Sequence, residues 1–359
     1  MNEGLQKAAR MAEDFCRLLQ RASADGRGEA LFGRDADEYG AAAEEAVGRS
    51  SLAHTDRVHY YFEFPLIGRP GLDIMVQYRC GSLLPGASFL KGDGFGYQQF
   101  FGELAQDRSF AEYLGFFAFD LSEGVRRPNV YLMPQLARAN CDYVPRMLQL
   151  LGEEGRTERT MRAFAAAPPG WQPYYAGLMK TREGAPTRLG FVTRAGLVGL
   201  YAADKAMIER DFGIYYPGGV PGAVCEQLMC LAKATEEDAC WDIQLNLLAD
   251  GSFDDYLGIT PDMGFRYNDV RHSERTLEGD RIGKIMGLLE SWNCADGRWH
   301  RMGEACCGIQ RMAGYKTDAG TIVRRKVADA IQLNAVKVRL KRTGAYLAKG
   351  YLIATTWDP

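Results

Sequence analysis

The chain has 359 residues, of which 47% are hydrophobic and 25% are charged, and its formal net charge is −3. This is an ordinary globular composition, and the length suits either one large closed α/β barrel or two domains. The small net charge and the lack of a Lys/Arg run argue against general nucleic-acid binding, and the lack of any stretch of about 18 apolar residues argues against a membrane span.

The first 22 residues have the spacing of an amphipathic helix. They contain acidic residues and no continuous apolar run, which is unlike a signal peptide. The nine cysteines are scattered and odd in number, which favours reduced thiols in a cytoplasmic protein over a disulfide framework. The four histidines lie far apart in the sequence, so we do not expect a zinc centre.

Five pairs of short strand-like segments follow, each joined by a turn and separated from the next pair by helical stretches. The predicted strands are 58–65 with 72–79, 115–121 with 128–134, 172–181 with 186–193, 240–248 with 255–261, and 335–342 with 346–355. Helices are expected near 95–108, 142–166, 194–212, 220–236 and 275–292, and 298–334 is expected to be mostly helical. Units of about 50–60 residues predict a structural repeat.

Several of these segments alternate between apolar and polar residues with a period of two, which places each kind on one face of a strand. In 72–79, Leu72, Ile74 and Val76 oppose Asp73, Gln77 and Arg79; segments 241–247 and 336–341 alternate in the same way. An open sheet with one face in water would have this pattern. A closed barrel would have it too, because closure removes the sheet edges, and its polar face would line a chamber.

Three motifs resemble the dimethylallyltryptophan-synthase family of aromatic prenyltransferases. The stretch "AFDLSEGVRRPNVYLMPQLARA" contains a Phe-Asp-Leu run at 119–121, followed by Tyr131 and Pro134. "YFEFPL" at 61–66 is similar to a glutamate-bearing first strand, and "VKVRLKRTGAYLAKGYL" at 336–352 is similar to the last hairpin. Pro134 would then end an inner strand.

The resemblance implies an α+β fold, a ten-stranded antiparallel barrel of five ββα repeats surrounded by helices. We expect a single domain over 1–359, with N-terminal helices in 1–55 and barrel repeats in 56–359. It also implies transfer of a dimethylallyl or longer prenyl group from its diphosphate to an indole or tryptophan-type acceptor, a small molecule or a peptide. Basic groups and tyrosine hydroxyls would hold the diphosphate, and the closed barrel would keep water from the allyl cation.

Residue roles follow from the same resemblance. Glu63 would bind the indole N–H and orient the acceptor. The other candidates for binding substrate or diphosphate are Asp73, Gln77, Arg79, Asn129, Tyr131, Arg188, Gln244, Tyr256, Lys337, Arg339, Tyr346 and Lys349. A solvated strand face or a satisfied barrel tyrosine would give the same pattern. Tyr346 and Tyr351 lie on opposite faces of the last strand, so at most one of them is expected to face the chamber. Positive charge is expected at the end of the chamber remote from Glu63.

The sequence also departs from the family pattern. Asn129 and Ser122 stand where lysines are expected, Gly190 and Val192 replace a lysine and a tyrosine, and Asp73 takes the place of an arginine. No cofactor is required by this chemistry, although Asp73 could help to bind Mg²⁺.

Two other functions are compatible with these losses. The same barrel could use Glu63 and Asp73 for acid–base cyclisation or isomerisation of an indole metabolite, or it could bind an aromatic metabolite without turnover. We expect a monomer or homodimer with no nucleic-acid or membrane partner. The glycine-rich segment 91–100 is interpreted as a loop over the barrel mouth.

Overall fold

The computed structural model describes residues 3–33, 59–82, 97–104, 106–123, 128–134, 140–216, 218–235, 239–263, 280–316 and 321–357. Helix α1 (Glu3–Ala22) confirms the amphipathic helix expected at the N-terminus, and the short helix α2 (Arg27–Leu31) follows it. The glycine-rich segment 91–100 lies mostly outside the described residues, so its interpretation as a loop over the barrel mouth stays a prediction.

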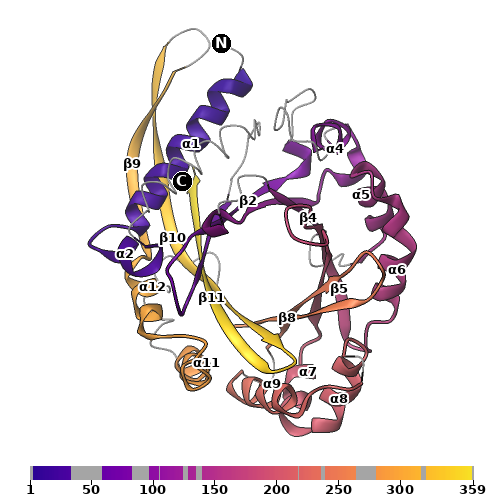
Figure 1. Cartoon of the computed structure of the whole chain (residues 1–359). Coiled ribbons are helices and arrows are strands. Elements are labelled where there is room, and N and C mark those ends of the chain that lie inside the picture. Colours follow the sequence, from indigo (N-terminus) through magenta and orange to yellow (C-terminus); the bar gives the residue numbers. More distant parts are fainter. Residues whose placement is uncertain are drawn as a thin grey trace.

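Ten antiparallel strands close into a ring (Figure 1). In ring order these are β1 (His59–Pro65), β2 (Asp73–Arg79), β3 (Leu114–Phe119), β4 (Asn129–Met133), β5 (Trp171–Leu178), β6 (Thr187–Thr193), β7 (Trp241–Leu247), β8 (Phe253–Pro261), β10 (Ile322–Lys341) and β11 (Gly344–Trp357). Pairing of β11 with β1 completes the ring, with Glu63 opposite Tyr351. The closed barrel is therefore confirmed, and the open sheet is excluded.

The alternation in the strands separates the two faces of the barrel as expected. Val76 and Tyr78 of β2 are buried on the outer face, and Phe62 and Phe64 of β1 are buried in the same way. Their neighbours Asp73 and Glu63 face the interior, where both line a cavity. The apolar core thus lies between the barrel and its helices, and this leaves polar side chains to line the interior. Pro134 directly follows β4, so the strand ends where predicted.

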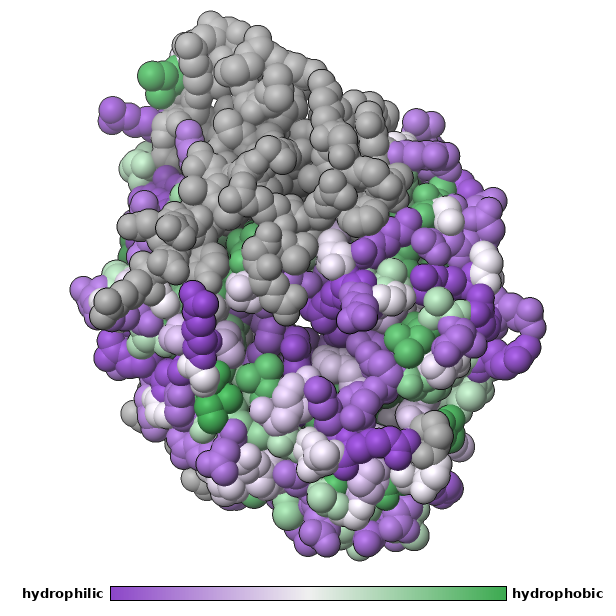
Figure 2. Space-filling model, in the orientation of Figure 1, coloured by the Kyte–Doolittle hydropathy of each residue, from purple (hydrophilic) through white to green (hydrophobic). Residues whose placement is uncertain are grey.

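Helices cover the outside of the ring (Figure 1). They are α4 (Tyr97–Leu104), α5 (Val144–Leu150), α6 (Thr157–Ala165), α7 (Leu197–Ala203), α8 (Lys205–Gly213), α9 (Gly222–Ala234), α11 (Asp280–Ser291) and α12 (His300–Glu304). Short 3-10 turns lie at Cys80–Ser82, Arg108–Phe110, Leu121–Glu123, Glu154–Arg156 and Gly297–Trp299. Hydrophilic residues dominate the described surface seen in Figure 2. Among the described helices, none is long and apolar enough to span a bilayer.

The expectation that 298–334 is mostly helical is wrong. Among the described residues of this range, helix is confined to Gly297–Trp299 and α12, and strand β9 (Cys307–Lys316) pairs with the first half of β10 outside the ring. The β-branched residues Ile322, Val327 and Ile331 favour this long strand. Buried Asp329 secures it, because this carboxylate binds Arg17 of α1 at 2.9 Å and Arg311 of β9 at 3.1 Å.

Candidate functional site

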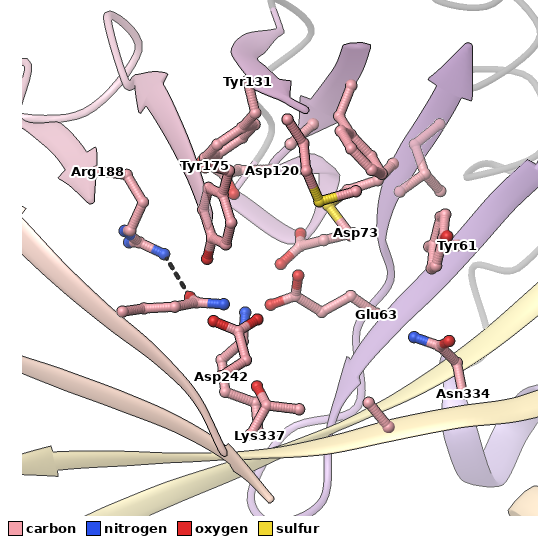
Figure 3. Close-up of a pocket in the computed structure, with 18 of the residues that line it drawn as sticks. Tyr61, Glu63, Asp73, Asp120, Tyr131, Tyr175, Arg188, Asp242, Asn334 and Lys337 are labelled. Atoms are coloured by element: carbon pink, nitrogen blue, oxygen red, sulfur yellow. Dashed lines mark hydrogen bonds between the residues drawn. The ribbon is translucent and has the colours of Figure 1, made fainter. Parts of the chain in front are cut away.

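The interior of the barrel holds a cavity of about 280 Å³. Side chains from strands on all sides of the ring line it, as Figure 3 shows for ten labelled residues. The lining residues are Tyr61, Glu63, Asp73, Ile74, Met75, Phe116, Ala118, Phe119, Asp120, Tyr131, Met133, Tyr174, Tyr175, Arg182, Arg188, Asp242, Gln244, Thr260, Asn334, Ala335, Lys337 and Arg339. The chamber thus combines four cations, four carboxylates and several aromatic rings.

Glycines in the barrel wall make room for the tyrosines of the chamber. The ring of Tyr131 lies against Gly177, where a Cβ would come within 2.1 Å of its Cδ1 atom. Tyr175 lies against Gly190 in the same way, at 2.2 Å. A side chain at either glycine would displace the ring into the cavity. The ring of Tyr175 therefore occupies the space that a side chain at position 190 would take.

Glu63 is already paired with two cations. Lys349 Nζ lies 2.8 Å and Arg339 Nη2 lies 3.4 Å from Glu63 Oε1. Burial alone would raise the pKa of Glu63, but Lys349, Lys337 and Arg339 hold it well below its ordinary value. The closest approach of both ion-pair partners is to Oε1, so Oε2 is the oxygen better placed to accept a hydrogen bond from a ligand. The expected separation of Glu63 from the positive charge is wrong, because cross-strand pairing brings β10, β11 and β1 together.

Asp73 is fully engaged by protein groups. Its Oδ2 accepts from Lys349 Nζ at 2.8 Å, and its Oδ1 accepts from the backbone N and the Oγ of Ser122 at 3.0 and 2.6 Å. The described residues contain no group of three His, Cys, Asp or Glu side chains that could hold a metal ion. Asp73 therefore does not fit the Mg²⁺ ligand that the sequence allowed. Ser122, at a position where a lysine was expected, thus donates two hydrogen bonds to this carboxylate.

Asp120 forms a second internal ion pair. Arg182 donates two hydrogen bonds to it, at 3.0 and 2.8 Å, and Asn129 Nδ2 donates a third at 3.1 Å. Asn129 in turn accepts from Thr181 Oγ1 at 2.8 Å. Asn129 is fully buried and does not line the cavity. It acts here as a support for Asp120 and not as a direct contact for a ligand. We call Glu63, Asp73, Asp120, Arg182 and Lys349 the paired cluster.

Arg188 on β6 has a different environment. Its Nε donates to Asn246 at 2.6 Å and its Nη1 donates to Gln244 at 2.9 Å, the contact drawn in Figure 3. Its guanidinium lies 4.5 Å from the centre of the Tyr256 ring. Arg188 Nη2 is buried and has no hydrogen-bond partner. Neutral side chains thus hold the Arg188 guanidinium, and its Nη2 group remains available to donate to a ligand.

Lys337 on β10 is buried, and no carboxylate in the described part of the chain lies within ion-pair distance of its ammonium group. The ammonium lies 4.8 Å from the centre of the Tyr351 ring. Burial lowers its pKa, with Glu63 acting in the opposite direction. Lys337 therefore adds a second cation with free donor capacity on this side of the chamber.

Tyr256 reports the electrostatic potential of this region. Burial alone would raise the pKa of its hydroxyl, but Arg188, Arg339 and Lys337 lower it to about 8. A phenol in a buried site that still ionises more readily than in water lies in a positive potential. The region around Tyr256 therefore favours an anion.

Asp242 on β7 carries no ion pair, although it lines the same cavity. Its Oδ1 is buried without a hydrogen-bond partner. Burial raises its pKa to about 6, and Lys337, Gln244 and Arg188 only partly oppose this shift. We call Arg188, Lys337, Asp242 and Tyr256 the open cluster, because within the described part of the chain Arg188 Nη2 and Asp242 Oδ1 have no hydrogen-bond partner, Lys337 has no ion pair, and Tyr256 packs against Arg188.

Most of the candidates from the sequence meet in this chamber. Glu63, Asp73, Tyr131, Arg188, Gln244, Lys337 and Arg339 line it, Lys349 binds two of the lining residues, and Tyr256 lies beneath Arg188. Gln77 accepts a hydrogen bond from Tyr61 at 2.5 Å and lies outside the lining. Arg79 is an exposed residue at the end of β2 and lies outside the lining, so its role stays a prediction.

Neither Tyr346 nor Tyr351 is in the cavity lining, so the structure does not contradict the expectation that at most one of them faces the chamber. The register of β10 and β11 shifts between Arg339 and Leu340, and this irregularity brings Tyr346 beside Lys341, at 4.8 Å from ring centre to ammonium. Tyr346 is 38% exposed and lies at the rim near Arg339, whereas Tyr351 is buried beside Lys337. A bulge reorients one residue of a strand, which a period of two cannot anticipate.

Arg182, Tyr175 and Asp242 were not among the predicted site residues. Arg182 lies in the turn between β5 and β6, where alternation gives no signal. Asp242 did carry a signal, because it shares the polar face of 241–247 with Gln244 and Asn246. Tyr175 could have been found by the glycine opposite it, but only once the register was known.

Comparisons with known proteins add little to this picture. No family model and no curated protein matches the sequence. A solved structure of a 6-dimethylallyl tryptophan synthase is similar over 95% of this chain and 94% of that chain, with 14% sequence identity and a TM-score of 0.45. The chain is a helix-covered, ten-stranded antiparallel barrel, and its chemistry follows from the groups inside its own chamber.

Proposed function

We propose that the protein is an aromatic prenyltransferase that moves a dimethylallyl or longer prenyl group from its diphosphate to an indole or tryptophan-type acceptor. The observation that carries this proposal is the open cluster. Arg188 and Lys337 form no ion pair with a carboxylate in the described part of the chain, and together with Arg339 they lower the pKa of Tyr256 to about 8. Such a region binds a diphosphate and stabilises the charge that develops as it leaves.

The acceptor would lie between this region and Glu63. The Oε2 oxygen of Glu63 can accept a hydrogen bond from an indole N–H, while Lys349 and Arg339 hold the carboxylate in place through Oε1. The aromatic side chains Tyr61, Phe116 and Tyr175 supply flat apolar surface for the ring. Glu63 would thus orient the ring and raise its nucleophilicity, although its two cationic partners moderate the second effect.

The closed wall of the barrel supports the same chemistry. An allyl cation reacts with water unless water is kept away from it. Here the ring of ten strands surrounds the cavity, and the tyrosine rings packed on Gly177 and Gly190 add aromatic faces. Aromatic faces attract cations. They would therefore stabilise the allyl cation without reacting as a base.

The direct experiment is to incubate the purified protein with dimethylallyl diphosphate and a panel of tryptophan, indoles and tryptophan-containing peptides. We expect a prenylated product and one diphosphate released for each product. Glu63→Gln should weaken alkylation more than donor binding, and Asp255→Asn, on the exposed part of β8, is the matched control. Tight binding of an aromatic compound without product, for every donor and with Mg²⁺ present, would instead support a non-catalytic binder.

Acid–base cyclisation or isomerisation of an indole metabolite is the second candidate. Asp242 favours it, because an unpaired carboxyl group with a pKa of about 6 can both give and take a proton near neutral pH. This reaction needs no diphosphate donor. Conversion of an indole metabolite in the absence of any prenyl diphosphate would therefore distinguish it from prenyl transfer.

A further inference from the structure

We infer that Asp242 is the group that accepts the proton from the alkylated ring; this rests on the proposed prenyl transfer. After the prenyl group bonds to an aromatic carbon, that carbon still carries its hydrogen and the ring is a cation. The proton must leave for aromaticity to return. A base is therefore needed inside the chamber, close to the reacting carbon.

The other carboxylates of the lining are poorly suited to take this proton. Glu63 and Asp73 both bind Lys349 at 2.8 Å, and Asp120 accepts two hydrogen bonds from Arg182. A carboxylate held by a cation is a weak base. Among the described residues that line the cavity, Asp242 is the carboxylate without an ion pair.

The position of Asp242 fits this role. Figure 3 shows the carboxyl groups of Asp242 and Glu63 both turned towards the middle of the chamber. Both residues line the cavity, one from β7 and one from β1. A flat acceptor whose N–H binds Glu63 would present its far edge to Asp242. The buried, partnerless Oδ1 of Asp242 is the atom that would receive the proton.

The bonds and charges balance in one sequence. The C–O bond of the donor breaks, and diphosphate leaves with the electron pair. A ring carbon then forms a C–C bond to the prenyl carbon. The ring C–H bond breaks, its electrons return to the ring, and the proton passes to Asp242, which later releases it to water. The products are the prenylated ring, diphosphate and one proton.

The ionisation of Asp242 gives the step a pH signature. The charged and titratable groups that act on it are Lys337 from β10 and Arg188 from β6, and it acts in turn on Tyr175 from β5; the residue opposite it on β8 is the uncharged Thr260. With a pKa of about 6, Asp242 is mostly a carboxylate at pH 7.5 and mostly protonated at pH 5. The kcat of the wild-type protein should therefore fall with acid through an apparent pKa near 6.

The test compares Asp242→Asn and Asp242→Glu with Asp250→Asn, a matched change in the exposed β7–β8 turn of the same hairpin. Asp242→Asn should lower kcat by about 100-fold and remove the acidic limb of its pH profile. It should also create a primary kinetic isotope effect with an acceptor deuterated at the reacting carbon, because proton loss becomes slow. Asp242→Glu should recover part of the rate, and Asp250→Asn should behave as wild type.

A second experiment distinguishes failure of this inference from failure of the proposed prenyl transfer. It measures exchange of the bridging oxygen in an ¹⁸O-labelled prenyl diphosphate. The exchange reports ionisation of the donor, and it should continue in Asp242→Asn. The inference is overturned if that variant keeps kcat within about threefold of wild type with no isotope effect, or if the wild type has no acidic limb near pH 6. Failure of the wild type to transfer any prenyl group is a different result, and it overturns the proposed function itself.

Discussion

The paired and open clusters occupy one chamber, yet they differ in how the protein treats charge. In the paired cluster, Glu63, Asp73 and Asp120 are each satisfied by a cation at 3.0 Å or less. In the open cluster, Arg188 Nη2 and Asp242 Oδ1 are buried without partners. Buried polar groups without partners cost stability, so proteins keep them mainly where a ligand completes them. The difference fits the proposal that the open cluster binds the donor, while the ion pairs of the paired cluster fix the shape of the chamber and hold Glu63 in place for the acceptor.

The largest expected effect is on diphosphate affinity, and it compares Arg188 of the open cluster with Arg182 of the paired cluster. Arg188→Met should weaken binding of inorganic diphosphate by about 100-fold, because hydrogen bonds to charged groups contribute about 1.5–3 kcal/mol each. Isothermal titration calorimetry measures this directly. Arg182→Met should leave diphosphate affinity nearly unchanged, since Asp120 already occupies its guanidinium.

Arg182→Met should instead reduce the free energy of unfolding by about 2 kcal/mol, because it leaves Asp120 buried without its cation. Urea denaturation measures this loss. Equal loss of diphosphate affinity in both variants would abolish the distinction between the clusters.

Gly190→Ala tests the packing that keeps the chamber open. Its Cβ would lie 2.2 Å from Tyr175 Cε1, so the tyrosine ring must move into the cavity. We expect a loss of about 1–3 kcal/mol in the free energy of unfolding. Gly155→Ala is the control, because no heavy atom lies within 4 Å of a Cβ there. The two variants would unfold at the same urea concentration if the glycine in the wall had no steric role.

Tyr256 should give diphosphate binding a dependence on alkaline pH. Its phenol ionises with a pKa of about 8, so above that pH a negative charge appears beside Arg188 and opposes the anion. Affinity for diphosphate should fall by up to about tenfold per pH unit there. Tyr256→Phe should remove the part of this fall that belongs to the protein. A pH profile that is identical in the two proteins would show that the diphosphate lies elsewhere.

The last comparison concerns the contribution of Asp242 to stability. Its pKa in the folded state is raised above the ordinary value of 3.8 to about 6, so its ionisation opposes folding. The folded state is therefore penalised above pH 6, and the penalty disappears as pH falls through that value towards 4. Asp242→Asn should raise the free energy of unfolding by up to about 3 kcal/mol at pH 8 and by well under about 1 kcal/mol at pH 4. Thermal melts at both pH values measure this difference, and an equal gain at both would exclude ionisation as its cause.

Much of the barrel could be predicted from local patterns. All five hairpins lie where turn residues and alternation placed them, because a strand with one apolar face is encoded within a few residues. The first half of β10 was misread, since Ala328 and its neighbours also suit a helix and only pairing with β9 decides between the two. The bulge beside Tyr346 could not be predicted, because a bulge is a property of two strands together.

The sequence predicted many of the residues in the site, but it did not predict which of them form ion pairs with one another. Alternation and the resemblance together placed Glu63, Arg188 and Lys337 on inward faces, and the structure brings all three to one cavity. The pairing of cations with carboxylates depends on contacts between distant parts of the chain. Lys349 and Glu63 are 286 residues apart in the sequence, and they meet only because β11 pairs with β1. Asp242 was not predicted for the same reason. Its lack of an ion-pair partner among the described residues can be seen only in the folded structure.

The sequence alone determined that this protein would form strands with one polar and one apolar face, in five hairpins separated by helices. That information is local, since the period of a strand and the chemistry of a turn are set by adjacent residues. The tertiary structure decided which charges would be neutralised and which would remain available. Closure of the ring sets distances between residues far apart in the chain, and electrostatic energy depends on those distances.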